Sequence, residues 1–379
     1  MGDILHALPA VTALRLAHPD WEIGWVVEPR WQPLLRAGSR EQGSGIGGNR
    51  EAEATIRNSE KPVRDAAMPV VDRLHFAPSR DWKRHPFSAN TRRAIGALRR
   101  ELRAAGYSAV LDLQGAIRSA VIARISGCPR RIGEAAPREW PAQWLFTERV
   151  VTHGAHVIEQ DLELASAVAG DPFAADLAGA SGLAKNSGLT NPAPLLPIDP
   201  EAEAWCANWL AGTFPSTSSG SAKPIALITP GAGWGAKRWP PERYAAVAEG
   251  LAQRGLHVVV NAGPGEEPLA TTIASGSAVA LTATLPQLIA LTRRIALCIG
   301  GDTGPLHLAS ALGRPVVGIY GPTDPSRNGP YGTRARVLRS PCSRRDHSRR
   351  AAPDPGLLTI SPDDVLRAAA ELLTEESAR

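Results

Sequence analysis

Residues 296–320, ALCIGGDTGPLHLASALGRPVVGIY, decide the fold of this chain. The apolar runs at 296–299 and 316–320 have the length of buried strands, and residues 305–312 between them have the apolar spacing of a helix. Parallel strands need a long crossover, usually a helix, whereas antiparallel strands can be joined by a tight turn. The stretch therefore predicts one β-α-β unit of a parallel sheet.

The same alternation continues upstream of this unit. It predicts, in chain order, a strand at 225–229, a helix at 241–253, a strand at 257–261 and helices at 267–274 and 285–292. Regular alternation of this kind predicts a doubly wound α/β domain with helices on both faces of the sheet. Ser361 is the predicted N-cap of a last amphipathic helix at 362–373.

A second α/β pattern fills the first half of the chain. It comprises a helix at 3–17, a strand at 22–28, a helix at 89–105, a strand at 109–113 and a helix at 117–126. Here the chain opens on a helix, although the first strand of such a domain normally precedes its first helix. We therefore expect Met1 to be a misplaced start, with an apolar first strand encoded ahead of it.

Length predicts more than one domain, because 379 residues exceed the size at which a single core keeps growing. We predict a first Rossmann-like domain at 1–195, a second at 196–355 and a terminal helical segment at 356–379. Residues 38–69 are rich in Gly, Ser, Asn, Glu and Arg without an apolar period, which predicts a mobile insert. A ligand site is expected between the two domains.

Composition narrows the class of protein. Hydrophobic residues make up 43% and charged residues 21%, and no apolar run reaches the ~18 to 20 residues that span a bilayer. An acid at residue 3 does not fit a signal peptide, and the scattered cysteines predict reduced thiols in the cytoplasm: Cys128, Cys206, Cys298 and Cys342. The net charge of +5, without a nucleic-acid motif, favours an anionic small partner over nucleic acid.

The segment 300–307, GGDTGPLH, predicts an anion site. Pro305 suits the first position of a helix, so the backbone N–H groups of Asp302, Thr303 and Gly304 would point out of the carboxyl edge of the sheet. Such a helix start binds phosphate, and His307 lies one turn into the helix. The alternative is a capped helix in which Asp302 or Thr303 bonds its own backbone.

Residues 229–240, TPGAGWGAKRWP, form a Gly-rich loop after a strand, in which Gly231, Ala232, Gly233 and Lys237 could hold a diphosphate. The loop also matches a dinucleotide fingerprint. The helix starts too late and no acid follows at the required spacing, which disfavours a nicotinamide site. Glu266, beyond the next strand, could accept ribose hydroxyls or could simply favour a helix dipole as a first-turn acid. Three loops thus predict one sugar-nucleotide site.

Transfer to an alcohol needs a general base and stabilisation of the leaving diphosphate. Asp3, at the start of the first helix, is the candidate base, and an ordinary N-cap is the alternative. The sequence has no Asp-x-Asp motif and no His/Cys cluster, so we expect no metal and no cofactor. Lys237 and the N–H groups around Thr303 would stabilise the diphosphate instead.

Basic residues in the first half could bind an acidic acceptor. They occur as Arg80, Lys83 and Arg84 in one cluster and as Arg130, Arg131 and Arg138 in another. A solvated basic face is the commoner origin of such clusters.

Five motifs resemble those of the ADP-heptose:lipopolysaccharide heptosyltransferases, glycosyltransferase family 9. They are MGDILHALPA at 1–10, DLQGAIRSA at 112–120, KRWP at 237–240, GDTGPLHLA at 301–309 and YGPTDP at 320–325. The likeness covers nearly the whole chain apart from inserts, and WVVE at 25–28 favours the heptosyltransferase I branch.

This resemblance implies a GT-B fold, in which two Rossmann-like domains face a cleft and a terminal helix packs back toward the first domain. It implies metal-independent, inverting transfer from ADP-heptose to the Kdo region of lipid A. The match gives Asp3 as base, Lys237 and 302–304 as diphosphate contacts and Glu266 as ribose contact. Lys83, Arg84 and Arg138 match acceptor positions. A monomer docked on the inner leaflet of the cytoplasmic membrane is expected.

Two other interpretations fit the same residues. One is a different nucleotide-sugar enzyme of this fold, such as another glycosyltransferase or an epimerase, because fold does not determine function. The other is a sugar-nucleotide binder without catalysis. An epimerase would need no acceptor, and a binder would release no ADP.

Overall fold

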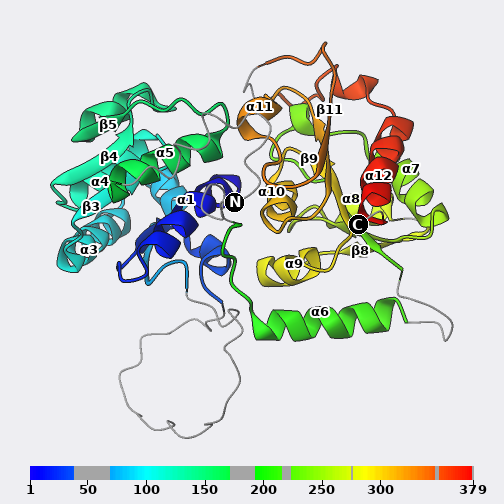
Figure 1. The fold of residues 1–379 in the computed structure, drawn as a ribbon, viewed down its shortest axis with the longest axis horizontal. Coiled ribbons are helices and arrows are strands. Elements are labelled where there is room, and N and C mark those ends of the chain that lie inside the picture. Colours follow the sequence, from blue (N-terminus) through cyan, green and yellow to red (C-terminus); the bar gives the residue numbers. More distant parts are fainter. Residues whose placement is uncertain (38–68, 171–192, 216–222, 275, 346–349, 378–379) are drawn as a thin grey trace, which may run out of the picture.

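The computed structural model describes residues 1–37, 69–170, 193–215, 223–274, 276–345 and 350–377. Two α/β domains lie side by side, and the N-terminus lies between them (Figure 1). Apart from Pro69, the insert predicted at 38–69 falls outside the described residues. Within the described ranges, no helix has both the length and the apolar character needed to cross a membrane.

The second domain contains one parallel sheet of strands that alternate with helices. Its strands are β6 (Ile225–Thr229), β7 (His257–Asn261), β8 (Ala278–Leu281), β9 (Leu297–Gly301), β10 (Val316–Tyr320) and β11 (Ala335–Arg339). Its α-helices are α6 (Pro200–Thr213), α7 (Pro241–Gln253), α8 (Glu267–Ile273), α9 (Leu285–Thr292), α10 (Gly304–Ala311), α11 (Pro325–Asn328) and α12 (Pro362–Ser377). Short 3-10 helices are η3 (Gly235–Lys237) and η4 (Leu357–Thr359).

The strand order β11-β10-β9-β6-β7-β8 places the switch point of this sheet between β6 and β9. From β6 the chain proceeds outward to β7 and β8, and from β9 it proceeds the other way to β10 and β11. Loops that follow the two central strands therefore diverge and leave a crevice at their carboxyl ends. The prediction of a doubly wound domain is confirmed.

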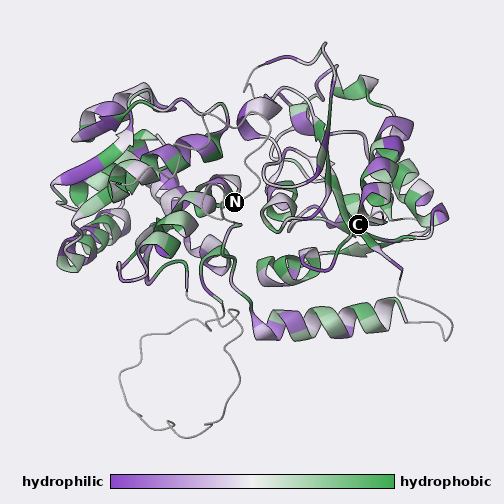
Figure 2. Ribbon diagram, viewed as in Figure 1, coloured by the Kyte–Doolittle hydropathy of each residue, from purple (hydrophilic) through white to green (hydrophobic). Residues whose placement is uncertain are grey.

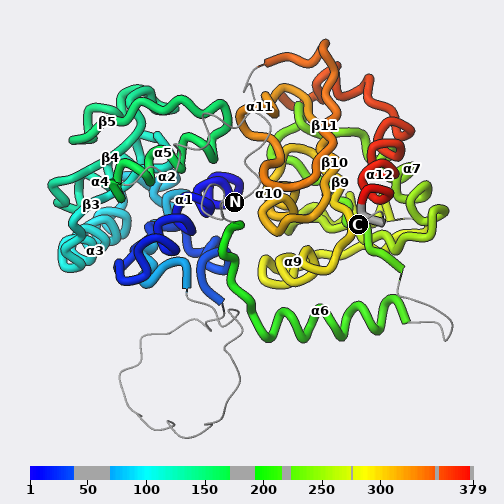
Figure 3. The backbone as a smooth tube through the Cα atoms, in the orientation of Figure 1, coloured from blue at the N-terminus to red at the C-terminus, as the bar shows by residue number. Residues whose placement is uncertain are grey.

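Both faces of this sheet are covered, which explains why its strands read as continuous apolar runs. Along β6, Leu227 packs into one core, whereas Ala226 and Ile228 pack into the other, as expected for side chains that alternate across a sheet. Figure 2 shows hydrophobic residues along the central strands, and hydrophobic and hydrophilic residues interspersed along α7 and α12. Figure 3 shows α6 running beside α9, against which it packs.

The terminal helix corrects one prediction. We expected it to pack toward the first domain, but α12 lies against α7, β10 and β11 of the second domain. Its apolar stripe of Val365, Ala369 and Leu372 has helical spacing and is fully buried in the core that α7 also lines. Ser361 caps the helix as predicted, because its Oγ accepts from the Asp364 N–H. The domain boundaries themselves stay a prediction.

The first domain contains shorter strands and two separate sheets. One sheet pairs β1 (Gly24–Val27) with β2 (Arg73–Phe76); the other contains β3 (Ala109–Asp112), β4 (Arg130–Glu134) and β5 (Glu148–Val150). Its helices are α1 (Gly2–Ala17), α2 (Ser79–Arg84), α3 (Ala89–Ala105), α4 (Ile117–Ile125) and α5 (Val157–Ala169), with 3-10 helices η1 (Pro29–Leu34) and η2 (Trp140–Leu145). The strand expected ahead of Met1 stays a prediction.

Helix α1 joins the two domains. It is buried on nearly all sides, packing against α5 of its own domain and against α10 of the second. Leu5 and Leu8 of α1 belong to the same apolar core as Leu306 of α10. The domain interface therefore contains a dry, apolar part, and the start of α1 is held close to the switch point.

Asp161 of α5 is an unpaired buried carboxyl group that should destabilise the fold at neutral pH. It is 3% exposed, and its Oδ2 has no hydrogen-bond partner. Burial, together with the carboxylates of Asp3 and Glu134, raises the pKa of Asp161 well above its usual value. In the unfolded chain the pKa of an aspartate is about 3.9. Stability is therefore lost as pH rises above that value.

We predict that Asp161→Asn stabilises the protein at pH 7.5 by about 1 to 3 kcal/mol, because the amide keeps the shape of the carboxyl but has no charge to bury and no proton to take up on folding. The gain should shrink toward pH 4, where about half of the unfolded chains also bind the proton. Urea unfolding at both pH values measures it, with the exposed Asp20→Asn as control. Unchanged or lower stability of Asp161→Asn at pH 7.5 would refute the prediction.

Candidate functional site

Three loops of the second domain meet at one edge of the sheet. They follow β6, β7 and β9, and all three leave the carboxyl ends of parallel strands. The loops after β6 and β9 flank the switch point, where open α/β sheets bind their ligands. The residues predicted for the donor site lie on these loops and on the first turn of α10.

Asp302 lies at the centre of this site. Its Oδ2 is ion-paired with Lys237 Nζ, and its Oδ1 lies 3.0 Å from Nε2 of His307. Burial acts to raise the pKa of Asp302, but the hydrogen bond from His307 and the charge of Lys237 outweigh it and lower that pKa well below its usual range. Asp302 therefore stays ionised and holds the Lys237 ammonium and the His307 ring in fixed positions.

Lys237 is held from two sides. Its Nζ also lies 3.4 Å from the backbone oxygen of Asp302 and 4.4 Å from the centre of the Trp234 ring. Only 11% of the lysine side chain is exposed. A lysine that is held in this way presents a positive charge at a fixed place, where it can stabilise a developing negative charge.

Thr303 is the N-cap of α10, but its side chain makes no capping hydrogen bond. Its Oγ1 is buried without a partner among the described residues. The alternative of a self-capped helix is therefore not what the structure shows. The free hydroxyl and the first N–H groups of α10 leave donors available for an anion.

The Gly-rich loop after β6 lies against Glu266. A Cβ atom on Gly231 would come within 2.2 Å of Glu266 Oε2, so only glycine allows this approach. Glu266 Oε2 also accepts from the Gly263 N–H at 3.3 Å. Ala232 is buried, and a Cβ atom on Gly233 would meet nothing within 4 Å. The loop thus has a closed side toward Glu266 and an open side.

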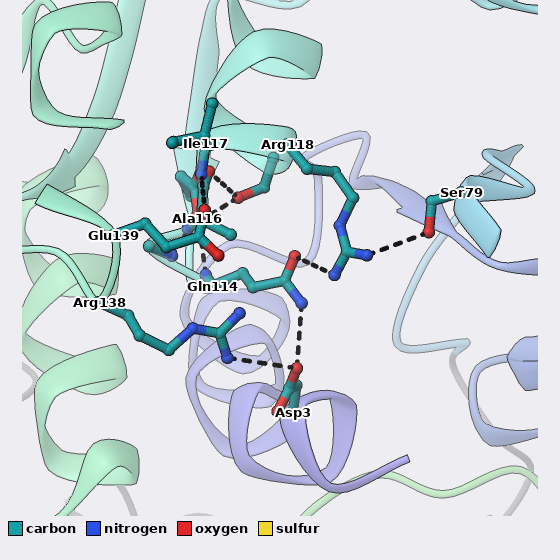
Figure 4. A network of polar contacts seen from close by, with 11 residues as sticks. Asp3, Ser79, Gln114, Ala116, Ile117, Arg118, Arg138 and Glu139 are labelled. Carbon is teal, nitrogen blue, oxygen red and sulfur yellow. Dashed lines mark hydrogen bonds and ion pairs between the residues drawn. The ribbon is translucent and has the colours of Figure 1, made fainter. Parts of the chain in front are cut away.

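In the first domain, Asp3 faces a polar network instead of capping its helix. Met1 is the N-cap of α1, so the N-cap alternative for Asp3 is wrong. Gln114 Nε2 donates to Asp3 Oδ2 at 3.0 Å, and Arg138 Nη1 lies 3.9 Å from the same oxygen (Figure 4). The Asp3 side chain remains 63% exposed. Its carboxylate is thus oriented by neighbours and open to a ligand.

The loop that carries Gln114 is itself fixed. Asp112 Oδ1, at the end of β3, accepts from the N–H groups of Gln114 and Gly115, both at 2.9 Å. Gly115 has φ +61°, and a Cβ atom there would lie 3.0 Å from the Arg138 backbone nitrogen. A residue with a side chain would therefore disturb the approach of Arg138 to the loop.

Gln114 and Arg118 were not predicted as site residues. Arg118 Nη2 donates to Gln114 Oε1, and its Nη1 donates to Ser79 Oγ, both at 3.3 Å (Figure 4). The sequence carried a usable signal, because Gln114 follows the carboxyl end of a predicted strand, where ligands bind. Arg118 could be found only once the structure had brought α2 and α4 together.

The predicted acceptor residues lie at different distances from Asp3. Arg138 is brought to Asp3, whereas Lys83 and Arg84 lie exposed in the last turn of α2. Ser79 at the other end of α2 receives the hydrogen bond from Arg118. Lys83 and Arg84 thus lie on a helix that borders the network, and no described contact joins them to Asp3.

The two half-sites approach each other across the domain interface. A Cβ atom on Gly304 would overlap the Met1 side chain, and one on Gly2 would lie 3.6 Å from His307 Cδ2. Gly304 therefore permits the starts of α1 and α10 to meet, whereas Gly2 has room for a Cβ atom at ordinary contact distance. The helix start that carries the Asp3 carboxylate thus neighbours the helix start with the anion-binding groups, an arrangement suited to removing a proton on one side and stabilising an anion on the other.

Known proteins share both the sequence pattern and this architecture. Lipopolysaccharide heptosyltransferase 1 of Escherichia coli (strain K12) is 28% identical over 349 residues, covering 90% of this chain and 91% of the relative. Lipopolysaccharide heptosyltransferase 3 of Escherichia coli is 27% identical over 333 residues, covering 85% of this chain and 81% of the relative.

Solved structures agree on the fold. E. coli heptosyltransferase WaaC with ADP-2-deoxy-2-fluoro heptose has a TM-score of 0.68 at 23% identity, covering 98% of this chain and 96% of that one. A glycosyltransferase family 9 protein from Veillonella parvula DSM 2008 has a TM-score of 0.70 at 19% identity, covering 99% and 94%. The predicted GT-B fold of two Rossmann-like domains is confirmed.

The family model for glycosyltransferase family 9 (heptosyltransferase) matches residues 95–353, more than half of the chain. That range includes the loops after β3, β6, β7 and β9 that build the site. The chain is a glycosyltransferase and belongs to glycosyltransferase family 9, the heptosyltransferases.

Proposed function

We propose that this glycosyltransferase moves heptose from ADP-L-glycero-D-manno-heptose to a Kdo residue of Kdo-lipid A, a step in building the lipopolysaccharide inner core. One observation carries the proposal: the Asp3 carboxylate is oriented at the start of α1, and this helix start meets the start of α10, next to the Lys237, Asp302 and Thr303 group. The relatives named as lipopolysaccharide heptosyltransferases supply the substrate class.

Asp3 acts as the general base in this proposal. Its carboxylate takes the proton of the acceptor hydroxyl while that oxygen forms a bond to the anomeric carbon of the heptose. The bond from the anomeric carbon to the ADP oxygen breaks on the opposite side, so the configuration inverts. Gln114 and Arg138 hold the carboxylate in place for this attack.

The leaving ADP carries the electron pair of the broken bond on its diphosphate. Lys237, the backbone N–H groups of 302–304 and the Thr303 hydroxyl stabilise that charge, with the dipole of α10 behind them. Glu266, which lies against Gly231, accepts hydrogen bonds from the ribose hydroxyls. Full activity in the presence of EDTA is expected, because protein groups supply this stabilisation.

The acceptor is acidic, and the first domain offers cations to bind it. Arg138 lies beside Asp3, Arg118 contacts the Gln114 that binds Asp3, and Lys83 and Arg84 lie exposed on α2. Carboxylate and phosphate groups suit such side chains, arginine above all because it binds them in a bidentate manner. Because this acceptor is a lipid, the protein would act as a monomer bound peripherally to the inner face of the cytoplasmic membrane.

An exposed apolar surface beside this site is suited to the membrane. Trp140 and Trp144 of η2 are 61% and 66% exposed, with their ring centres 4.6 Å apart. Ile117 and Val121 of α4, which packs on η2, are also exposed. Tryptophan partitions to the headgroup region of bilayers, and the surrounding arginines suit anionic lipids. We assign this Trp140/Trp144 surface to lipid docking.

Replacing Trp140 and Trp144 together with serine should lower sedimentation with vesicles of anionic phospholipid roughly 10-fold, since burying an aromatic side chain contributes over ~1.4 kcal/mol. Turnover on a water-soluble acceptor analogue should stay unchanged. Val337→Ser removes an exposed apolar side chain from the second domain and serves as control. Equal vesicle binding by the double variant and the wild type would rule out this surface.

A donor panel tests the proposed function. ADP-heptose is expected to give the highest kcat/KM with Kdo-lipid A, ahead of other nucleotide sugars, and the new glycosidic bond should have the opposite anomeric configuration to the donor, read by NMR. Interconversion of sugar nucleotides without an acceptor would indicate an epimerase. Tight binding of ADP-heptose without ADP release under any acceptor would indicate a binder without catalysis.

A further inference from the structure

Two histidines from different domains meet beside the donor site. His6 Nε2 of α1 lies 3.3 Å from His307 Nδ1 of α10. Both side chains are buried, at 9% and 6% exposure, and their rings meet edge to face with centres 4.5 Å apart. The two residues are 301 positions apart in the chain, so only the contact between the domains brings them together.

The pair continues a chain of contacts that ends at Lys237. His307 Nε2 lies 3.0 Å from Asp302 Oδ1, and Asp302 Oδ2 is ion-paired with Lys237 Nζ. An ionised carboxylate can only accept, so His307 Nε2 must carry the proton that lies between them. In neutral His307 the other nitrogen, Nδ1, is then an acceptor. His6 Nε2 consequently donates its N–H to His307.

His6 is suited to this role because it stays neutral. Burial, and then the neighbouring His307 and His156, lower the pKa of His6 well below its usual value. His156 of α5 packs edge to face on His6, with ring centres 5.8 Å apart, and its own Nε2 lies 3.1 Å from the Gly329 oxygen. Packing on both sides therefore fixes the orientation of the His6 ring.

Helix α1 also carries Asp3, one turn before His6. Residues three apart in a helix are neighbours on its surface, so α1 carries the proposed base and this N–H on adjacent turns. The Met1 side chain lies so close to Gly304 that a Cβ atom would not fit between them, which leaves little room for the helix start to shift without moving α10.

We propose that His6 is a positioning residue that couples the domain interface to the donor site. Its N–H fixes the orientation of His307 in the tautomer that Asp302 selects; His307 holds Asp302, and Asp302 holds Lys237 toward the diphosphate. When the domains separate, the N–H leaves and this arrangement loosens. The donor is therefore held most firmly when α1, and with it Asp3, is in place. The proposal rests on the proposed function for the identity of the donor.

Three substitutions of His6 test the coupling. Glutamine places an amide N–H near the position of Nε2, asparagine places one near Nδ1, and leucine places none. His6→Leu and His6→Asn should weaken ADP binding roughly 10-fold and lower kcat by at least as much, because one buried hydrogen bond and the orientation it fixes are lost. KM for the acceptor should change less than about 2-fold, because acceptor contacts lie elsewhere.

His6→Gln should recover most of the ADP affinity and kcat, which a purely structural role of the histidine ring would not explain. Calorimetric titration with ADP alone gives the affinity independently of turnover, and thermal unfolding shows that each variant is folded. Wild-type ADP affinity in His6→Leu, or equal losses in His6→Leu and His6→Gln, would overturn the proposal. A wild type that binds ADP but transfers no heptose would remove the proposed function and leave this test valid.

Discussion

Asp3→Asn is expected to lower kcat roughly 100- to 10,000-fold, the range that general-base catalysis contributes, while ADP affinity changes less than about 2-fold. The amide keeps the shape of the carboxylate and can still contact Gln114, but it cannot take a proton. Asp3 lies in the first domain and contacts Gln114, whereas the proposed donor-binding loops belong to the second domain, so donor binding should not depend on Asp3. Single-turnover kinetics and ADP titration measure the two effects separately.

Asp20→Asn is the matched control, because Asp20 is an exposed acid that follows the same helix and lies outside the network. It should turn over like the wild type. If Asp3→Asn kept more than about a tenth of the wild-type kcat, Asp3 would lose the role of base, since even the weakest general-base contribution exceeds that.

Lys237→Ala is expected to lower kcat roughly 100- to 1,000-fold, as removal of one preorganised charge or donor at a developing anion does. Unlike Asp3→Asn, this variant should also bind ADP more weakly, because in the proposed mechanism the ammonium contacts the diphosphate before and after transfer. The contrast between the two variants separates a residue that acts on the acceptor from one that acts on the donor.

Removal of Lys237 also leaves Asp302 as a buried charge with His307 as its remaining described partner. Some loss of stability is therefore expected. The double variant Lys237→Ala with Asp302→Asn removes that charge and should restore unfolding temperature without restoring kcat. Lys223→Ala, an exposed lysine of the same domain, is the control. Recovery of kcat in the double variant would show that Lys237 acts only through stability.

The low pKa of Asp302 limits which groups can cause a loss of activity at acidic pH. The ion pair with Lys237 and the bond from His307 are present above the ordinary aspartate pKa and are lost only as pH falls through the lowered value in the folded protein. Any acid limb of activity between pH 5 and 7 must therefore come from another group than Asp302.

Much of the second domain could be predicted, because its elements are long and its strands are buried on both faces. The predicted bounds of β6, α7, β7, α9 and β10 agree with the structure residue for residue. The edge strands β8 and β11 were not predicted. Their residues are only partly buried, so their apolar pattern is weak.

The first domain was harder to predict for the same reason. β4 reads RRIGE and β5 reads ERV, which are charged segments of sheet with little apolar signal. The predicted packing of α12 on the first domain was wrong. An amphipathic stripe shows that a helix packs against a core but not against which one.

The site shows a similar division. Asp302, Lys237 and Glu266 could be placed from the sequence, because loops after parallel strands meet at one edge of a sheet. His6 and Arg118 could not, since their partners His307 and Ser79 lie on elements that only tertiary packing brings near. Local sequence pattern therefore predicts the loops that carry the site. The residues that hold those loops in place are found only in the structure.

Release of ADP from ADP-heptose with Kdo-lipid A, in EDTA and without added metal, tests the central claim most directly. We expect ADP release only when the lipid acceptor is present. The amount of ADP should equal the amount of acceptor that carries one additional heptose, measured by mass spectrometry. ADP release without heptose on the acceptor, or no release by folded protein that binds ADP-heptose, would contradict it.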